Sequence, residues 1–237
     1  MRTIVFCSIV CCAGAFYACE QSSVGPIPPP SVIYAAADYM LNAKAGDSEV
    51  FKQTVYDSSW NMINPPSTLT MTVVGTNVPL DNGEKAVEVA YTLDGHPQPD
   101  ETDYIASSDS GIVSYSDIDC KKSKNLLLNP LGEGKSFRIT NDDYRVEDYI
   151  VIDSLNTTIK TSAGTFPALK LTECQVSTDQ SSDHIKDSAS VDIYLVAGYL
   201  EAYQVETDVQ KLSADGQGND IVLSKSITVT DLTSKTW

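Results

Sequence analysis

The stretch Thr68-Leu69-Thr70-Met71-Thr72-Val73 alternates a threonine with an apolar side chain at every step. Because successive side chains of a β-strand point to opposite faces, this period of two predicts a strand with one buried and one solvated face. Residues 87–93 alternate in the same way. Asp81-Asn82-Gly83 between the two runs supplies a turn, since Asn and Gly tolerate positive φ. These residues therefore predict an antiparallel hairpin.

The same pattern continues toward the C-terminus. Further strands are expected over residues 112–118, 126–128, 149–152, 155–161, 166–176, 191–196, 199–208 and 221–232. Regular spacing of short strands and turns is typical of an antiparallel meander. Because half of each strand is apolar, the sheet must curl on itself or pack against another layer. The prediction is a mainly β domain, an antiparallel meander forming a curved sheet or half-barrel.

One segment near the N-terminus favours a helix instead. Residues 31–38 begin with Ser31, a suitable N-cap after three prolines, and continue through a run of alanines. The following residues, 39–55, are compatible with an opening strand broken at Gly46. We expect a short N-terminal helix over 31–38.

Residues 1–18 have the features of a signal peptide. Arg2 is the only charged residue before Glu20, and the apolar run that follows it is too short to cross a bilayer. Phe16-Tyr17-Ala18-Cys19 resembles the lipobox of bacterial lipoproteins, in which the cysteine is acylated. We predict that Cys19 is the lipidated first residue of the mature chain. The alternative is an ordinary secretory signal cleaved nearby.

The residues after Cys19 predict an extended tether. Residues 19–30 are rich in serine and proline, which cannot form a packed core. A single β domain is then expected over residues 31–237. Its length is ample for a hydrophobic core.

The chain is strongly acidic, with a formal net charge of −16 at pH 7. Such a charge repels phosphate backbones and anionic lipid headgroups. Nucleic acid is therefore not an expected partner. The expected membrane contact is the lipid anchor.

Two cysteines remain in the predicted domain, Cys120 and Cys174. An even number of cysteines in an exported chain is compatible with a disulfide. Two separate buried thiols are equally compatible with the sequence. We predict that Cys120 and Cys174 approach each other closely.

Four segments occur in an order that resembles a family of bacterial envelope proteins. They are Tyr39-Met40-Leu41-Asn42 followed by Gly46, residues 129–137, residues 161–171 with Ala163-Gly164-Thr165-Phe166, and residues 194–200. In them the chain is similar to lipoprotein-carrier and DUF3108-type domains. The resemblance implies a curved, half-open antiparallel sheet and a location in the bacterial cell envelope, where the outer membrane is expected. It carries over no catalytic residues.

The residues that common catalytic sites require are few. The two histidines, His96 and His184, lie in polar segments far apart, and no nucleophile-elbow or phosphate-loop motif occurs. The acidic segments 100–103, 141–143 and 215–220 lack the ligand spacing of a calcium loop, and turn chemistry explains them. We expect no enzyme, no cofactor and no metal site.

Tyrosine is the one residue type that suggests a binding site. There are 12 tyrosines against 5 phenylalanines. A tyrosine offers a flat apolar body and a polar tip. The candidate ligand-binding residues are Tyr115, Tyr149, Tyr194, Tyr199 and Tyr203. They are equally suited to ordinary packing in the core.

The function expected from these features is that of a non-catalytic, lipid-anchored envelope protein. Its concave sheet face is expected to bind a hydrophobic ligand or a partner protein. The alternative is a structural or adhesive surface lipoprotein with a filled core.

The anchor gives the first testable prediction. Replacing Cys19→Ala should release the protein in soluble, folded form, because Cys19 lies outside the predicted β domain. Metabolic labelling with a fatty-acid probe measures acylation directly. A wild-type chain that takes up no label, and whose mature N-terminus is another residue, would replace the lipoprotein hypothesis with ordinary secretion.

Overall fold

The computed structural model describes residues 35–139, 146–178, 185–199, 201–213 and 220–237. These residues form one 310 helix, η1 (Ala36–Tyr39), and a sheet of twelve strands. The predicted signal peptide, Cys19, the tether and residues 31–34 of the expected helix lie outside the described residues. The strands are β1 (Ser48–Asp57), β2 (Ser67–Pro79), β3 (Lys85–Leu93), β4 (His96–Ser108), β5 (Gly111–Tyr115), β6 (Ser123–Leu128), β7 (Ser136–Arg138), β8 (Val146–Thr161), β9 (Gly164–Thr178), β10 (Ile185–Leu195), β11 (Tyr203–Ser213) and β12 (Asp220–Lys235).

The sheet is an antiparallel meander, as predicted. Its strand order is β6-β5-β4-β3-β2-β1-β12-β11-β10-β9-β8-β7, so every neighbour is also a neighbour in sequence except the pair β1–β12. That pair runs from Glu49 opposite Lys235 to Asp57 opposite Ser226. The first and last strands therefore lie in the middle of the sheet, and its two free edges, β6 and β7, come from the middle of the chain.

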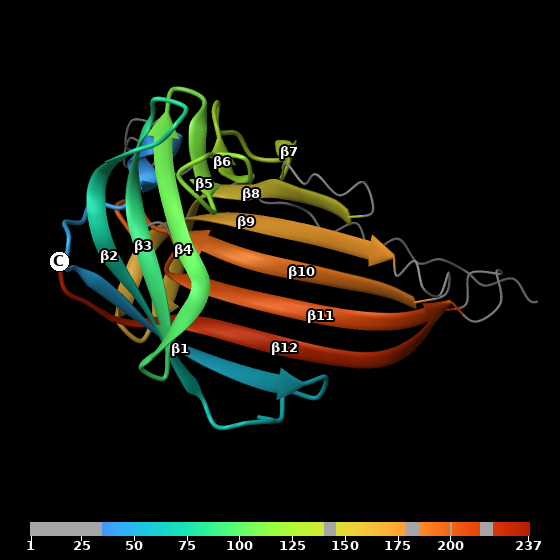
Figure 1. Ribbon diagram of the computed structural model, residues 1–237. Helices are drawn as coiled ribbons and strands as arrows, with labels where there is room; N and C mark the ends of the chain where they lie inside the picture. The colour runs from blue at the N-terminus through green and yellow to red at the C-terminus, as the bar shows by residue number, and fades with distance from the viewer. Residues whose placement is uncertain (1–34, 140–145, 179–184, 200, 214–219) are drawn as a thin grey trace, which may run out of the picture. The chain divides into compact units, whose positions relative to one another are not determined.

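The two edges approach each other and nearly close the sheet into a barrel. The side-chain amide of Asn125 on β6 donates a hydrogen bond to the carbonyl oxygen of Arg138 on β7, at 3.2 Å. Lys124 on β6 lies 3.1 Å from Glu173 on β9. Figure 1 shows β2 to β5 curling up on one side of the long strands β8 to β12. The predicted curved, barrel-like antiparallel sheet is confirmed.

The core lies inside the curl and comes from the alternating apolar positions. Met71 and Val73 on β2, Val89 on β3 and Leu171 on β9 are among its buried residues. Because strand neighbours alternate, the threonines between Leu69 and Val73 remain on the other face. At the turn after β4, a Cβ on Gly111 would overlap the carbonyl oxygen of Leu127, so β6 can pack there only against glycine.

The sequence predicted most strands and missed two features. Strand β4 spans His96–Ser108, a segment for which no strand was predicted. The expected helix is reduced, within the described residues, to the four-residue turn η1, and the chain then enters β1. The turn at Gly83, with φ of 88°, and the hairpin between Thr161 and Gly164 lie where predicted.

Contacts link three of the four segments of the family resemblance to one another, and the segment 129–137 contacts η1. The Ala36 N–H donates to the side chain of Asn129 at 2.9 Å, and the Asn42 N–H donates to the Gly198 carbonyl at 3.1 Å. Phe166 and Tyr199 stack with ring centroids 5.3 Å apart. These contacts give the segments a structural role.

In the part of the chain that the structure describes, no helix has the length and apolarity needed to span a membrane.

Core packing gives a stability prediction. Leu171 is 1% exposed and Leu223 on β12 is 49% exposed. Leu171→Ala should lower the free energy of unfolding by about 2–5 kcal/mol, because it leaves a cavity. The matched control Leu223→Ala should change it by only about 0.5 kcal/mol. Urea unfolding followed by circular dichroism measures both, and equal effects would contradict the assigned core.

Candidate functional site

Several carboxylates occupy strand positions that face the interior of the barrel. Glu49 is two residues before the buried Phe51 on β1, and Glu173 is two residues after Leu171 on β9. Side chains two apart on a strand share a face. Glu206 shares its face with Gln204 on β11 in the same way. On β1, β9 and β11, acidic side chains therefore lie on the inward face of the sheet, in line with the side chains two residues away.

The first hollow lies between β1–β3 and the start of β11. Its volume is 230 Å³. Apolar and aromatic side chains form one part of its wall and polar ones the other: Phe51, Leu69, Met71, Tyr91 and Tyr199, with Glu49, Gln53, Glu201, Gln204 and Thr230.

The second hollow adjoins the first, because both are lined by Glu201 and Gln204. Its volume is 240 Å³. Lys124 and Leu126 reach it from β6, and strands β8 to β11 together with Glu201, in the connection between β10 and β11, supply the rest. The remaining lining residues are Ile150, Leu171, Glu173, Val191, Ile193, Leu195 and Glu206. We call the two together the inner hollow.

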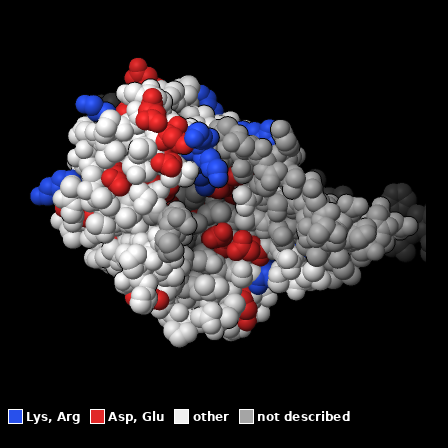
Figure 2. Space-filling model, in the orientation of Figure 1, with Lys and Arg blue, Asp and Glu red and all other residues white. Residues whose placement is uncertain are grey.

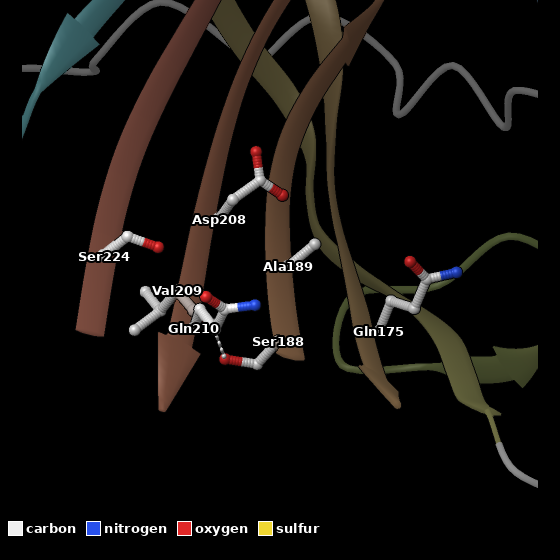
Figure 3. Close-up of a pocket in the computed structure, with 7 residues that line it drawn as sticks. All are labelled: Gln175, Ser188, Ala189, Asp208, Val209, Gln210 and Ser224. Carbon is white, nitrogen blue, oxygen red and sulfur yellow. Dashed lines mark hydrogen bonds between the residues drawn. The ribbon is translucent and has the colours of Figure 1, made fainter. Parts of the chain in front are cut away.

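A third depression of 330 Å³ lies farther along the long strands and is largely polar. Figure 3 shows its seven lining residues, which come from the adjacent strands β9 to β12. The Ser188 hydroxyl donates to the Val209 carbonyl oxygen at 3.4 Å. Gln175 follows Glu173 by two residues, and Asp208 follows Glu206 by two. The depression therefore continues the same face of the sheet outward from the inner hollow.

Acidic side chains also gather around a hollow in the middle of the face shown in Figure 2. In a chain of net charge −16, carboxylates on the surface are expected. Carboxylates inside the barrel are not, because burying a charge without a partner is costly.

Glu49 is the clearest case. Its side chain is 1% exposed, and neither carboxylate oxygen has a hydrogen-bond partner. Burial and the charge of Glu201, opposed by Lys235, together raise the pKa of Glu49 to about 9. Glu49 is therefore mostly protonated at neutral pH in the free protein.

Glu201 joins the two halves of the inner hollow. Burial raises its pKa, Lys124 lowers it, and Glu173 and Glu206 raise it, which together give a pKa of about 7. Asp148, which is 4% exposed, has a carboxylate oxygen without a partner, and burial raises its pKa as well. Lys124 is thus the cation that several interior carboxylates share.

The aromatic wall carries two polar contacts. Burial raises the pKa of Tyr91, whose hydroxyl donates to Asp103 at 3.4 Å. The ammonium of Lys235 lies 3.9 Å from the centroid of the Tyr199 ring. That ring therefore already binds one cation through its face.

Comparisons with known proteins bear on the fold alone. Two crystal structures are similar over most of the chain. One is a "putative exported protein with YmcC-like fold" from Bacteroides fragilis, with 12% identity, a TM-score of 0.51, and coverage of 85% of this chain and 100% of the other. The other is a "putative lipoprotein" from Parabacteroides distasonis, with 13% identity, a TM-score of 0.49, and coverage of 86% and 100%.

The chain shares the fold of the first of these structures. No protein-family model and no curated protein matches the sequence. The named resemblance to DUF3108-type domains thus remains a sequence-based expectation.

The five candidate tyrosines do not form one site. Tyr199 lines the inner hollow. The rings of Tyr194 and Tyr203 meet edge to face with centroids 5.8 Å apart, and as strand neighbours of Ile193 and Gln204 they face away from the hollow. Tyr149 is 41% exposed on β8. Tyr115 donates to Glu84 at 2.8 Å, in a separate small cluster.

Cys120 and Cys174 are free thiols in the structure and are not joined by a disulfide. Cys120 lies in the turn between β5 and β6, where its thiol donates to the carbonyl oxygen of Ile118 at 3.4 Å. Cys174 lies within β9, paired with Tyr149 and Ser190. The sequence could not reveal that they belong to different parts of the sheet.

Among the described residues, no group of three or more His, Cys, Asp or Glu side chains is arranged to hold a metal ion. His96 is exposed at the start of β4. His184 and the acidic segment 141–143 lie outside the described residues, as does most of 215–220.

Sequence reasoning missed the interior carboxylates, although a signal was present. Glu49 and Glu173 each stand in phase with buried apolar residues of the same strand. A charged residue in an inward position of a half-buried strand is a recognisable exception to the pattern.

Glu49 predicts a pH dependence of stability. A carboxyl whose folded pKa is raised from 4.5 to about 9 stabilises the fold fully below pH 4.5, and this contribution is lost as the pH rises to 9. Glu49→Gln cannot ionise. Between pH 5 and 9 its free energy of unfolding should fall less steeply than that of wild type, by up to about 1.4 kcal/mol per pH unit.

Urea titrations at several pH values measure this difference. Asp57 is the opposite case, since hydrogen bonds from Asn61 lower its pKa. Asp57→Asn should therefore alter stability while leaving the slope above pH 5 as in wild type. Parallel curves for Glu49→Gln and wild type would show that Glu49 is not buried as the structure has it.

Proposed function

We propose that this chain is an exported, lipid-anchored protein that binds a small amphiphilic molecule inside its barrel and does not catalyse a reaction. The observation that carries the proposal is the composition of the inner hollow. Apolar side chains such as Ile150, Ile193 and Met71 face carboxylates and amides across a space of 240 and 230 Å³ in its two parts. Binding sites for small molecules commonly combine an apolar lining with a few polar groups.

The geometry narrows the expected hydrophobic ligand to an amphiphile. A purely apolar ligand would leave Glu201 and Glu206 desolvated without compensation, which costs free energy. A molecule with one apolar and one polar end instead matches both walls. The polar depression beside Gln175 and Asp208 provides a solvated approach along the same face.

The lack of catalysis is part of the proposal. The interior offers carboxylates, tyrosines and one lysine, while His96 stands at an exposed strand end. Catalysis of acyl or phosphoryl transfer usually needs an activated nucleophile next to a base. The described hollow brings no such pair together.

We also propose the location. Acylation of Cys19 would hold the domain at a membrane of the bacterial cell envelope, and we propose the outer membrane. Support comes from the lipobox-like segment and from the sequence resemblance to envelope proteins. The net charge of −16 keeps the domain surface away from anionic headgroups, so the lipid would be the sole anchor.

A structural or adhesive role is the second candidate. Its support is the loop between β1 and β2, where Trp60, Met62 and Ile63 are each more than half exposed. Exposed apolar side chains that lie together often mark a protein contact. In this case the hollow would have no ligand, and an envelope protein would be the partner.

A substitution that fills the hollow discriminates between the ligand-binding role and the structural role. Val191 is 7% exposed inside the hollow, while Val176 is 39% exposed on the outer face of β9. In the full chain carrying Cys19→Ala, at least one of octanol, octylamine and octanoate should bind, as measured by calorimetry. Val191→Trp should abolish that binding, and Val176→Trp should preserve it.

Native mass spectrometry of the purified protein supplies a second measurement. Wild type should carry a co-purified small molecule that Val191→Trp lacks. If no amphiphile binds and no such molecule is found, the binding proposal fails in favour of the structural role.

A further inference from the structure

Glu49 is a buried carboxylate that the protein itself leaves without a partner. It is 1% exposed, lines the inner hollow, and neither of its oxygens accepts a hydrogen bond. A buried polar group without a partner destabilises a protein, so its presence calls for a physical reason. A ligand that donates hydrogen bonds or carries positive charge would supply the missing partner.

We propose that the inner hollow binds the protonated amine of an amphiphile, with Glu49 and Glu201 as its counter-charges and the apolar wall holding its hydrocarbon part. This inference rests on the proposed function and adds the chemical class of the ligand. The two carboxylates line the same hollow, and Thr230 and Gln204 beside them offer further acceptors for ammonium N–H groups.

The charge balance of the hollow favours a cation. Its described lining holds Glu49, Glu173, Glu201 and Glu206, against the single cation Lys124. Lys124 is already engaged, since its ammonium lies 3.1 Å from Glu173. Glu49 is mostly protonated in the free protein, so Glu201 and Glu206 are the acidic groups of the described lining that Lys124 leaves without an ion pair. An anionic amphiphile would meet their negative charge, whereas an ammonium would neutralise it and favour the ionised form of Glu49.

An ammonium group of the protein itself already lies against this aromatic wall. Lys235 places its ammonium 3.9 Å from the centroid of Tyr199, and Tyr199 lines the hollow together with Tyr91. Aromatic faces bind organic ammonium groups by cation–π attraction. The aromatic surface thus complements the carboxylates.

An organic ammonium suits this site better than a metal ion. Calcium requires six to eight oxygen ligands arranged around one point. Within the described residues no cluster of three or more metal-binding side chains exists. Phe51, Leu69 and Met71 occupy the wall where further oxygen ligands would have to stand.

Binding should be coupled to ionisation. The groups that face Glu49 are Glu201, Lys235 on β12 and Tyr91 on β3, and Tyr91 in turn contacts Asp103 on β4. The pKa values of about 9 for Glu49 and about 7 for Glu201 mean that protons leave as an ammonium enters. Affinity for an alkylammonium should therefore rise from pH 6 to pH 9.

The test compares three probes of equal chain length on the full chain carrying Cys19→Ala. Calorimetry at pH 8 should give octylammonium an affinity roughly tenfold or more above that of octanol, as expected for a buried charge-assisted contact. Octanoate should bind more weakly than octanol. Calcium chloride is titrated separately and as a competitor.

Two variants assign the effect to the site. Glu49→Gln keeps the shape of the side chain and removes its charge, so it should bind octylammonium roughly tenfold more weakly, bind octanol unchanged, and lose most of the pH dependence. Glu88→Gln is the matched control, since it removes a carboxylate from β3 on the face opposite Val89 and Tyr91, and it should bind as wild type does. Circular dichroism and thermal melts verify that both variants fold.

The results distinguish the proposed amphiphile site from the narrower proposal that its ligand is an amine. If octanol and octylammonium bind equally, and Glu49→Gln changes neither, the amphiphile site stands and the amine assignment is overturned. If calcium binds and displaces octylammonium, the site is one for metal ions and the amine assignment is again overturned. If no probe binds, the proposed function itself fails.

Discussion

The pairing of β1 with β12 is the contact on which the rest of the structure depends. Each half of the sheet, β1 to β6 and β7 to β12, is a chain of local hairpins. Among the described strands, the β1–β12 ladder is the one backbone pairing between the halves, and beside it Ser48 and Thr236, 188 positions apart, hydrogen-bond through backbone and side-chain groups. Because that loop must be closed before the ladder forms, the barrel carries a high entropic cost that interior packing has to offset.

The candidate site lies at the same β1–β12 pairing. Glu49 comes from β1 and Thr230 from β12, while Gln204 belongs to the next strand, β11. A buried, unpartnered carboxylate at the place where the two halves meet weakens the contact that holds them together. Local conflict with the fold at one position is characteristic of functional sites, where binding is favoured at the expense of stability. The inward Glu49 is more readily explained by a ligand than by folding.

The sequence predicted the architecture well because strand alternation is a local property. Residues 68–73 alone indicate which side chains face the core, and the turn at Asn82-Gly83 fixes the hairpin. The features that the sequence could not predict depend on how the sheet closes into a barrel. Tyr194 and Tyr203 lie in strands as expected. Whether their side chains point into the barrel or away from it depends on which side of the sheet curls inward. Whether Cys120 and Cys174 lie within reach of each other also depends on this curl, and in the structure both are free thiols. Strand β4 was missed because residues 96–103 are polar and contain two prolines, so they lack the apolar alternation that predicts a strand.

The unequal lengths of the strands explain why the interior is open at one side. Strands β5 and β6 have 5 and 6 residues, while β8, β9 and β12 have 16, 15 and 16. The short strands can cover only part of the long ones, so the far part of β9 to β12 has no strand opposite it. Its inward positions must then tolerate water, and they carry Gln175, Asp208 and Gln210 where the covered part carries Leu171, Val191 and Ile193. The change from polar to apolar lining along one face follows from strand length. An amphiphile could thus enter along the solvent-exposed polar part of this face and bind in its covered apolar part.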